Sequence, residues 1–264
     1  FLNANSFEEI LQNIVADFFN TFDIPQVTIK YSITDDMVSS YTELCPEHAR
    51  KEPEKIAGLN KFNGTTVPPK SIDGVFTILL NQKMIVEYIN QNNATWVGTI
   101  VHETAHVVDF TNYAKMINAE DYSDILSVDK NSMFQLWTEI NARSKGYYFV
   151  RKYTFGNDMF DEAQVPDIIN TELPGQERLL FQNYHATTNG WEQAYYVAQY
   201  IGRLYALQQI FPANFSDSQV KALLPPNPWM YDWFLFFKSH PTVKTAYPAF
   251  EEMKAILRQN FQGL

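Results

Sequence analysis

The segment His102-Glu103-Thr104-Ala105-His106 brings together side chains whose types and spacing suit metal-assisted hydrolysis. On an α-helix, residues four apart return to nearly the same face, so the two imidazoles can bind one zinc ion. Glu103, beside the first histidine, can then take a proton from a water molecule on the metal. The pattern predicts a zinc site with His102 and His106 as ligands and Glu103 as the general base.

Two predicted elements position this motif. Residues 74–81 form a short apolar, β-branched run between turn residues, which predicts a strand. A helix is expected over residues 82–90, and the motif helix is expected to begin near Ala94, after the candidate N-caps Asn92 and Asn93. Side chains at helical spacing predict that one stripe of the motif helix faces the core: Val97, Val101, Thr104, Ala105 and Val108.

The motif and the strand before it resemble the zincin metallopeptidases over roughly residues 74–150. The continuation His106-Val107-Val108-Asp109 resembles the anthrax lethal factor group. The order of strand, motif helix and later Glu-x-x-Ala helix is similar to that of the ImmA/IrrE-type peptidases. The resemblance implies a small sheet packed on the motif helix, Zn2+ as the cofactor, a substrate that pairs with a strand edge, and a glutamate as the third zinc ligand.

A catalytic zinc site needs a third protein ligand beyond the two histidines. Glu139 is the leading candidate because it lies well inside a helix expected over residues 132–153, where capping does not explain a carboxylate. It also opens a pattern that resembles the Glu-x-x-Ala helix of the glutamate zincins. The alternatives are a solvated carboxylate paired with Arg143, and Glu192 as the ligand. Glu192 already has a capping position three residues after Asn189.

Other polar side chains near the predicted site have several interpretations. Asp109 is expected to accept a ring N–H from a zinc-bound histidine, although a direct ligand role and an exposed loop position are alternatives. His185 is a candidate for a substrate contact, whereas His240 is expected to be structural or exposed and His48 to be solvated. Four tyrosines are candidates for stabilising the oxyanion of the reaction: Tyr147, Tyr148, Tyr195 and Tyr196.

Composition excludes several classes of protein. A net charge of −10 without a basic run argues against nucleic acid as a partner. No apolar run approaches the roughly 18 residues of a membrane span, so no membrane partner is expected. Cys45 is the single cysteine, which rules out an internal disulfide and a cysteine zinc site. A cytoplasmic location is expected, and secretion after removal of a signal peptide is the alternative.

We expect residues 1–264 to form one zincin-like domain, α+β and mainly helical, with the small sheet packed on the motif helix. The N-terminal lobe, residues 1–112, would carry the strand and the motif helix, and residues 113–264 would form a helical lobe. Residues 34–73 are expected to be mainly loop with a short helix near residues 54–59, and residues 154–189 to be irregular apart from a short helix near residues 166–171.

The function that these features predict is that of a zinc-dependent metallopeptidase acting on a protein or peptide. One alternative is a non-catalytic, zinc-stabilised binding domain of the same fold. Another is an enzyme that hydrolyses a non-peptide amide with the same activated water. Glu103 favours catalysis, because a structural zinc site has no need of a carboxylate beside its ligands.

Overall fold

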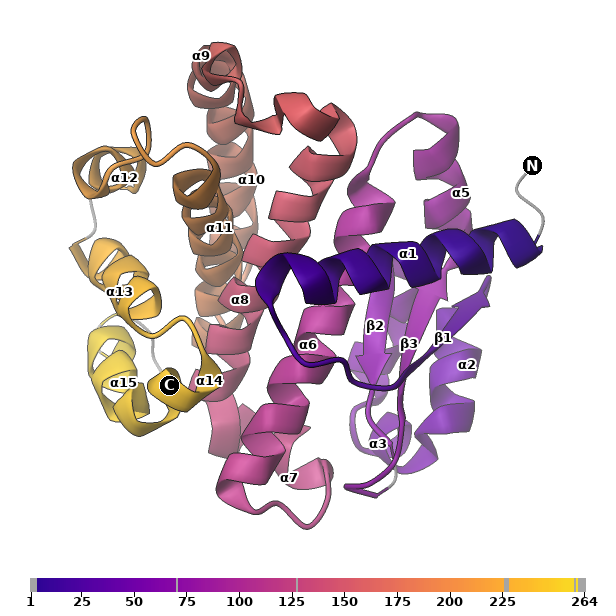
Figure 1. Ribbon diagram of the computed structural model, residues 1–264. Helices are drawn as coiled ribbons and strands as arrows, with labels where there is room; N and C mark the ends of the chain where they lie inside the picture. The colour runs from indigo at the N-terminus through magenta and orange to yellow at the C-terminus, as the bar shows by residue number, and fades with distance from the viewer. Residues whose placement is uncertain (1–3, 70, 127, 226–227, 259, 261–264) are drawn as a thin grey trace. The chain divides into compact units, whose positions relative to one another are not determined.

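The computed structural model describes residues 4–69, 71–126, 128–225, 228–258 and 260 (Figure 1). The chain divides into two compact units, Phe1–Asp124 and Ile125–Leu264, and the predicted boundary after residue 112 lies before this division. The prediction of a mainly helical α+β chain is confirmed, because the described residues form a small sheet and many helices.

The first unit contains a three-stranded sheet with the order β1-β3-β2 (Figure 1). Strand β1 (Ile29–Thr34) is parallel to the central strand β3 (Phe76–Asn81), and β2 (Gly64–Val67) is antiparallel to it. All six residues of β3 are buried, which explains why Ile78, Leu79 and Leu80 are consecutive apolar residues rather than alternating with polar ones. The strand predicted over residues 74–81 is therefore this central strand.

Helices cover both faces of the sheet in the first unit. The motif helix α6 (Thr95–Ile117) contacts β2 and β3, and α1 (Ala4–Phe22) packs on α6. On the other face, Val67 and Leu79 join a core cluster with the short helices of residues 37–61. Those helices are α2 (Met37–Leu44), α3 (Pro46–Lys51), α4 (Pro53–Ala57) and η1 (Leu59–Lys61), and α5 (Gln82–Asn90) follows β3.

The expectation that residues 34–73 are mainly loop is wrong. The prolines that suggested loop instead stand at the starts of helices, Pro46 in α3 and Pro53 in α4. Proline is favoured in the first turn because its missing N–H would have no intrahelical partner there. The side chain of Asp36 accepts the Ser39 N–H at 3.1 Å and caps α2. The same segment also supplies strand β2.

The second unit is helical, and its most extensive packing joins α8 (Val128–Phe155) to α11 (Gly190–Ile210). Helix α8 has non-helical backbone angles at Asn131, so its regular part begins close to the predicted residue 132. The large side chains of this core include Trp137, Phe149 and Phe237, which are fully buried. The other long helices are α10 (Leu173–Ala186), α13 (Pro228–Ser239) and α15 (Phe250–Arg258).

Short elements link these helices. The segment expected to be irregular, residues 154–189, contains several turns and the fourteen-residue helix α10, which the prediction missed. Pro174 stands in the first turn of α10, where proline is compatible with a helix. The short elements are α7 (Ser123–Leu126), η2 (Gly156–Phe160), η3 (Glu162–Gln164), α9 (Val165–Asp167), η4 (Ile168–Glu172), α12 (Asp217–Leu223), α14 (Val243–Ala246) and η5 (Tyr247–Ala249).

A glycine lets α11 approach α8 closely. A Cβ atom on Gly202 would lie 2.7 Å from the backbone oxygen of Ile140 and 2.9 Å from the Cβ of Arg143. Such distances are shorter than side chains normally allow, so a residue other than glycine would push the helices apart. On α8, Ile140 directly follows Glu139, and Arg143 lies one turn after it.

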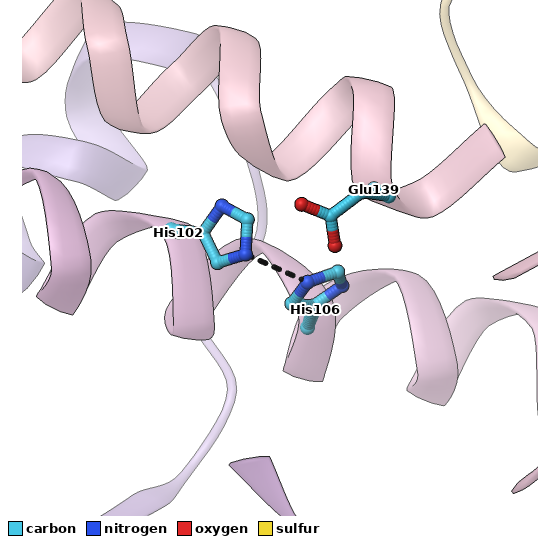
Figure 2. A group of neighbouring side chains, drawn as sticks. All are labelled: His102, His106 and Glu139. Atoms are coloured by element: carbon cyan, nitrogen blue, oxygen red, sulfur yellow. Dashed lines mark hydrogen bonds between the residues drawn. The ribbon is translucent and has the colours of Figure 1, made fainter. Parts of the chain in front are cut away.

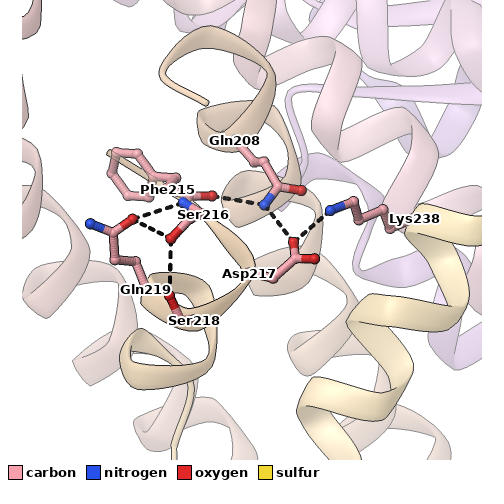
Figure 3. A network of polar contacts seen from close by, with 7 residues as sticks. All are labelled: Gln208, Phe215, Ser216, Asp217, Ser218, Gln219 and Lys238. Carbon is pink, nitrogen blue, oxygen red and sulfur yellow. Dashed lines mark hydrogen bonds and ion pairs between the residues drawn. The ribbon is translucent and has the colours of Figure 1, made fainter. Parts of the chain in front are cut away.

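Figure 3 shows a surface network at the start of α12. Ser216 and Gln219 form a capping box, in which the Gln219 side chain accepts the Ser216 N–H at 2.9 Å. Asp217 accepts hydrogen bonds from Lys238 at 2.5 Å and from Gln208 at 3.0 Å. The Lys238 ammonium lowers the pKa of the Asp217 carboxyl below its ordinary value. These contacts attach α12 to its neighbours α11 and α13.

Within the part of the chain that the structure describes, no helix combines the length and the apolar character needed to cross a membrane.

Candidate metal centre

The two histidines of the motif face each other on α6. Their Nε2 atoms lie 3.0 Å apart, and their rings are nearly perpendicular, with centroids at 4.6 Å. Phe110, one turn further along, stacks on the ring of His106 at 5.8 Å and also on Phe76 of β3 at 6.3 Å. The sheet therefore supports the imidazole of His106 through one intervening ring.

The spacing of the donor atoms fits a zinc ion. In tetrahedral coordination with Zn–N distances of about 2.0–2.1 Å, two nitrogen ligands lie roughly 3.3 Å apart, close to the spacing of the two Nε2 atoms. Among the described residues, His102, His106 and Glu139 are a group whose donor atoms could hold a metal ion (Figure 2). Two imidazole nitrogens and one carboxylate oxygen are a donor set typical of catalytic zinc. Binding of the metal itself stays a prediction.

Glu139 is buried on α8, with 5% of its surface exposed. Its Oε1 lies 3.9 Å from Nη2 of Arg143, the residue that the sequence suggested as an ion-pair partner. The same Nη2 donates a hydrogen bond to Gln199 of α11 at 2.8 Å. The contact with Glu139 is too long for a hydrogen bond, so Arg143 is held mainly by Gln199.

Glu103 is also buried, with 8% of its surface exposed, and β2 provides a partner for it. The hydroxyl of Thr66 lies 2.9 Å from Oε2 of Glu103 and 3.1 Å from its backbone oxygen, and these two acceptors share its single hydrogen. Side chains alternate along β2, so Thr66 faces α6 while Val67 faces the opposite cluster. Sequence reasoning missed Thr66, which precedes Glu103 by 37 residues and carries no local signal of this contact.

Strand β1 is attached to α6 next to Glu103. Thr104 donates to the backbone oxygen of Ile100 at 2.7 Å, so the hydroxyl of Tyr31 is the donor in its 2.8 Å bond to Thr104. Burial raises the pKa of Tyr31 well above its ordinary value, which keeps the hydroxyl protonated and able to donate. Two strands thus hold the motif helix through single hydroxyl groups.

Glu192, the chief competitor of Glu139, has local partners at the start of α11. Its N–H donates to the Asn189 side chain at 3.2 Å, and its carboxylate accepts the Thr187 hydroxyl at 2.5 Å. Glu192 is exposed, and among the described residues the metal-ligand group contains Glu139 rather than Glu192 or Asp109. Asp109 is buried on α6, and its predicted hydrogen bond to a zinc-bound histidine stays a prediction.

The remaining histidines lie in other surroundings. His185 is exposed on α10 and stacks on Phe181. His240 lies 2.9 Å from the backbone oxygen of Phe236 through its Nδ1, which agrees with a structural role. The expectation that His48 is solvated is wrong, because its side chain is only 17% exposed and its Nδ1 lies 2.7 Å from the Tyr41 hydroxyl.

The tyrosines proposed for the oxyanion differ in their contacts. The hydroxyl of Tyr147 donates to Glu172, and burial, followed by the charge of Glu172, raises its pKa above the ordinary value. Tyr195 stacks on Trp191 and meets Tyr196 edge to face. The hydroxyl of Tyr147 is therefore already committed to a carboxylate, and the oxyanion role of the other three stays a prediction.

Comparisons with protein-family models, with curated proteins and with solved structures find no match to this chain. The interpretation of the site therefore depends on its geometry and chemistry, and the resemblance to zincins stays a prediction.

Proposed function

We propose that this protein is a zinc-dependent peptidase whose metal is bound by His102, His106 and Glu139. The observation that carries the proposal is the pair of Nε2 atoms of His102 and His106, 3.0 Å apart on one helix, with the buried Glu103 beside the first ligand. Glu139 is the carboxylate that joins them in the candidate metal-ligand group. Each of the three side chains is a usual zinc ligand in hydrolases, and three protein ligands leave one position for water.

When bound, the zinc ion would lower the pKa of its water and polarise the carbonyl of the scissile bond. Glu103 would then act as the general base that accepts the proton of the water and returns it to the leaving amine. Thr66 limits the rotation of the Glu103 carboxylate by donating to Oε2. Phe110 holds the ring of His106 in one orientation by stacking on it.

Zinc analysis and one substitution test the proposal. The purified protein should hold about one zinc per chain, removable by chelators. Glu103→Gln should keep the zinc and lower kcat for peptide cleavage by about 10²–10⁴-fold, because an amide cannot accept the proton. Glu87→Gln, an exposed residue of α5, is the matched control and should cleave like the parent.

The outcomes separate the alternatives. A protein that neither contains nor takes up zinc contradicts the proposal. Stoichiometric zinc without cleavage of any peptide by the parent would favour the non-catalytic binding domain. Cleavage at the parent's rate by Glu103→Gln would show that Glu103 is not the base.

A further inference from the structure

The second unit concentrates positive charge within one helix pair, although the protein as a whole is acidic. Arg143 and Arg151 lie two turns apart on α8, and Arg203 lies on α11, which packs against α8. Buried or half-buried guanidinium groups require counter-ions, because removing a charge from water is costly. The partners of each arginine therefore indicate whether the charge is balanced within the unit.

Arg151 is balanced. It is 4% exposed, its Nη1 lies 3.3 Å from Oε2 of Glu172, and its Nη2 donates to Gln164. The other oxygen of Glu172 accepts the hydroxyl of Tyr147. Both oxygens of this carboxylate are thus engaged by Arg151 and Tyr147.

Arg203 is only partly balanced. It is half-buried, and with the described residues it forms neither an ion pair within 4 Å nor a hydrogen bond. Burial and the nearby charge of Arg143 lower the pKa of Arg203 to about 10, the charge of Glu172 opposes this, and the side chain is still a cation at neutral pH. Glu172 is already engaged by Arg151 and Tyr147, so one carboxylate serves two guanidinium groups and positive charge is in excess.

Arg143 has a counter-ion only at the long distance of its contact with Glu139. Its Nη2 donates to the neutral Gln199, its Nε is buried without an acceptor, and its ion-pair contact with Glu139 is 3.9 Å long. If Glu139 binds zinc, the charge of that carboxylate is shared with the metal. A Cβ atom placed on Gly202, the residue before Arg203, would lie 2.9 Å from the Cβ of Arg143. The backbones of α11 and α8 therefore pass close together beside both arginines.

We propose that Arg143 and Arg203 together bind a carboxylate group of the substrate. This inference rests on the proposed peptidase function and names its substrate class: peptides with a carboxylate near the bond that is cleaved. Guanidinium groups suit this role because their planar donors match both oxygens of a carboxylate. The position of Arg143, one helical turn after Glu139, keeps the bound carboxylate near a proposed metal ligand. The carboxylate can be an acidic side chain or the peptide's C-terminus.

Binding of glutarate tests the site without any need for catalysis. The dissociation constant would be measured by calorimetry for the parent, Arg203→Gln and Arg178→Gln. Arg178 is exposed on α10 and gives the same change of charge away from the site. We expect glutarate to bind the parent and the Arg178 variant equally, and Arg203→Gln to bind it about 10–100-fold more weakly. Equal binding by all three proteins, or none by the parent, would overturn the proposal.

The stability of Arg203→Met distinguishes a ligand site from a structural arginine. Methionine keeps much of the apolar stem and removes the unbalanced charge, so its unfolding temperature should equal or exceed that of the parent. A clearly lower unfolding temperature would show that the protein itself satisfies the guanidinium, which contradicts the proposal.

Matched peptides identify the source of the carboxylate. Four versions of one peptide would carry glutamate or glutamine near the cleaved bond, and a free or amidated C-terminus. The parent should cleave one acidic version at a kcat/KM about 10–100-fold above its neutral counterpart, and Arg203→Gln should lose this preference. Cleavage of all four at one rate contradicts the inference and leaves the peptidase function intact. Glutarate binding by a protein without any peptidase activity would contradict the peptidase function and leave the arginine site intact.

Discussion

Helix α6 of the first unit and helix α8 of the second each carry a buried glutamate, Glu103 and Glu139, and each is approached closely at a glycine. A Cβ on Gly64 of β2 would lie 2.9 Å from a methyl group of α6, and one on Gly202 of α11 would lie 2.7 Å from the backbone of α8. In the first unit β2 presents Thr66 to Glu103, and in the second α11 presents Gln199 to Arg143, the neighbour of Glu139 on α8.

The two carboxylates differ in what is presented to them. Glu103 accepts a neutral hydroxyl from Thr66, whereas Glu139 lies 3.9 Å from the guanidinium of Arg143. A nearby cation stabilises the ionised form of a carboxylate and weakens it as a proton acceptor, whereas a hydroxyl does so far less. A metal ligand has to be ionised, and a general base has to accept a proton. The proposal thus gives the ligand role to the carboxylate beside a guanidinium and the role of base to the carboxylate that accepts a hydroxyl.

The largest expected effect concerns the assignment of Glu139. Glu139→Ala should weaken zinc binding by more than about 100-fold, the upper range for residues that merely support a ligand. Glu192→Ala should retain the zinc affinity of the parent, because Glu192 has local partners at the start of α11. Competition with a chelating dye measures both affinities. If Glu139→Ala bound zinc as tightly as the parent, Glu139 would not be a zinc ligand.

Next in size is the effect of filling the close contact between α8 and α11. Gly202→Ala should lower the free energy of unfolding by about 1–3 kcal/mol, because its methyl group overlaps the backbone of Ile140. Gly175→Ala in α10 is the control, since nothing lies within 4 Å of its added methyl, and it should stabilise the protein by about 0.4–1 kcal/mol. Urea unfolding measures both, and equal effects would show that the close contact is not required.

The neutral partner of Glu103 gives a smaller effect on catalysis. Thr66→Val preserves the shape but removes the hydroxyl, so kcat should fall about tenfold while zinc content stays the same. Thr66→Ser restores the donor and should recover most of the activity. Unchanged kcat in the valine variant would show that Thr66 does not position the base.

The smallest effect is expected at the surface ion pair of Lys238 and Asp217. Lys238→Gln should change the free energy of unfolding by at most about 1 kcal/mol, because both side chains are well exposed. The pKa of Asp217 is lowered in the folded protein, so its stabilisation is present above the ordinary aspartate pKa of about 3.9. It is lost as the pH falls through the lower, folded pKa. A pH-independent difference between parent and variant, measured by urea unfolding, would contradict this.

Local patterns predicted several elements well. The helix at residues 82–90 is present as α5, α11 begins directly after the cap expected at Asn189, and the central strand lies within residues 74–81. Each depends on a periodicity or a cap within a few neighbouring residues, such as Asn189 accepting the Trp191 N–H. By contrast, β2 is only four residues long and is defined by pairing with β3, so its own sequence carries little signal.

The sequence by itself determined that His102 and His106 face the same way with Glu103 between them, because the turn of a helix is set by local backbone geometry. It also singled out Glu139 as a candidate ligand from its position inside a helix. Only the tertiary structure decided that Thr66 contacts Glu103 and that Arg203 lies near Arg143. Those contacts join residues 37 and 60 positions apart, and strand pairing and a glycine contact between helices create them. No local spacing encodes such contacts, because the free energy that forms them comes from packing between distant segments.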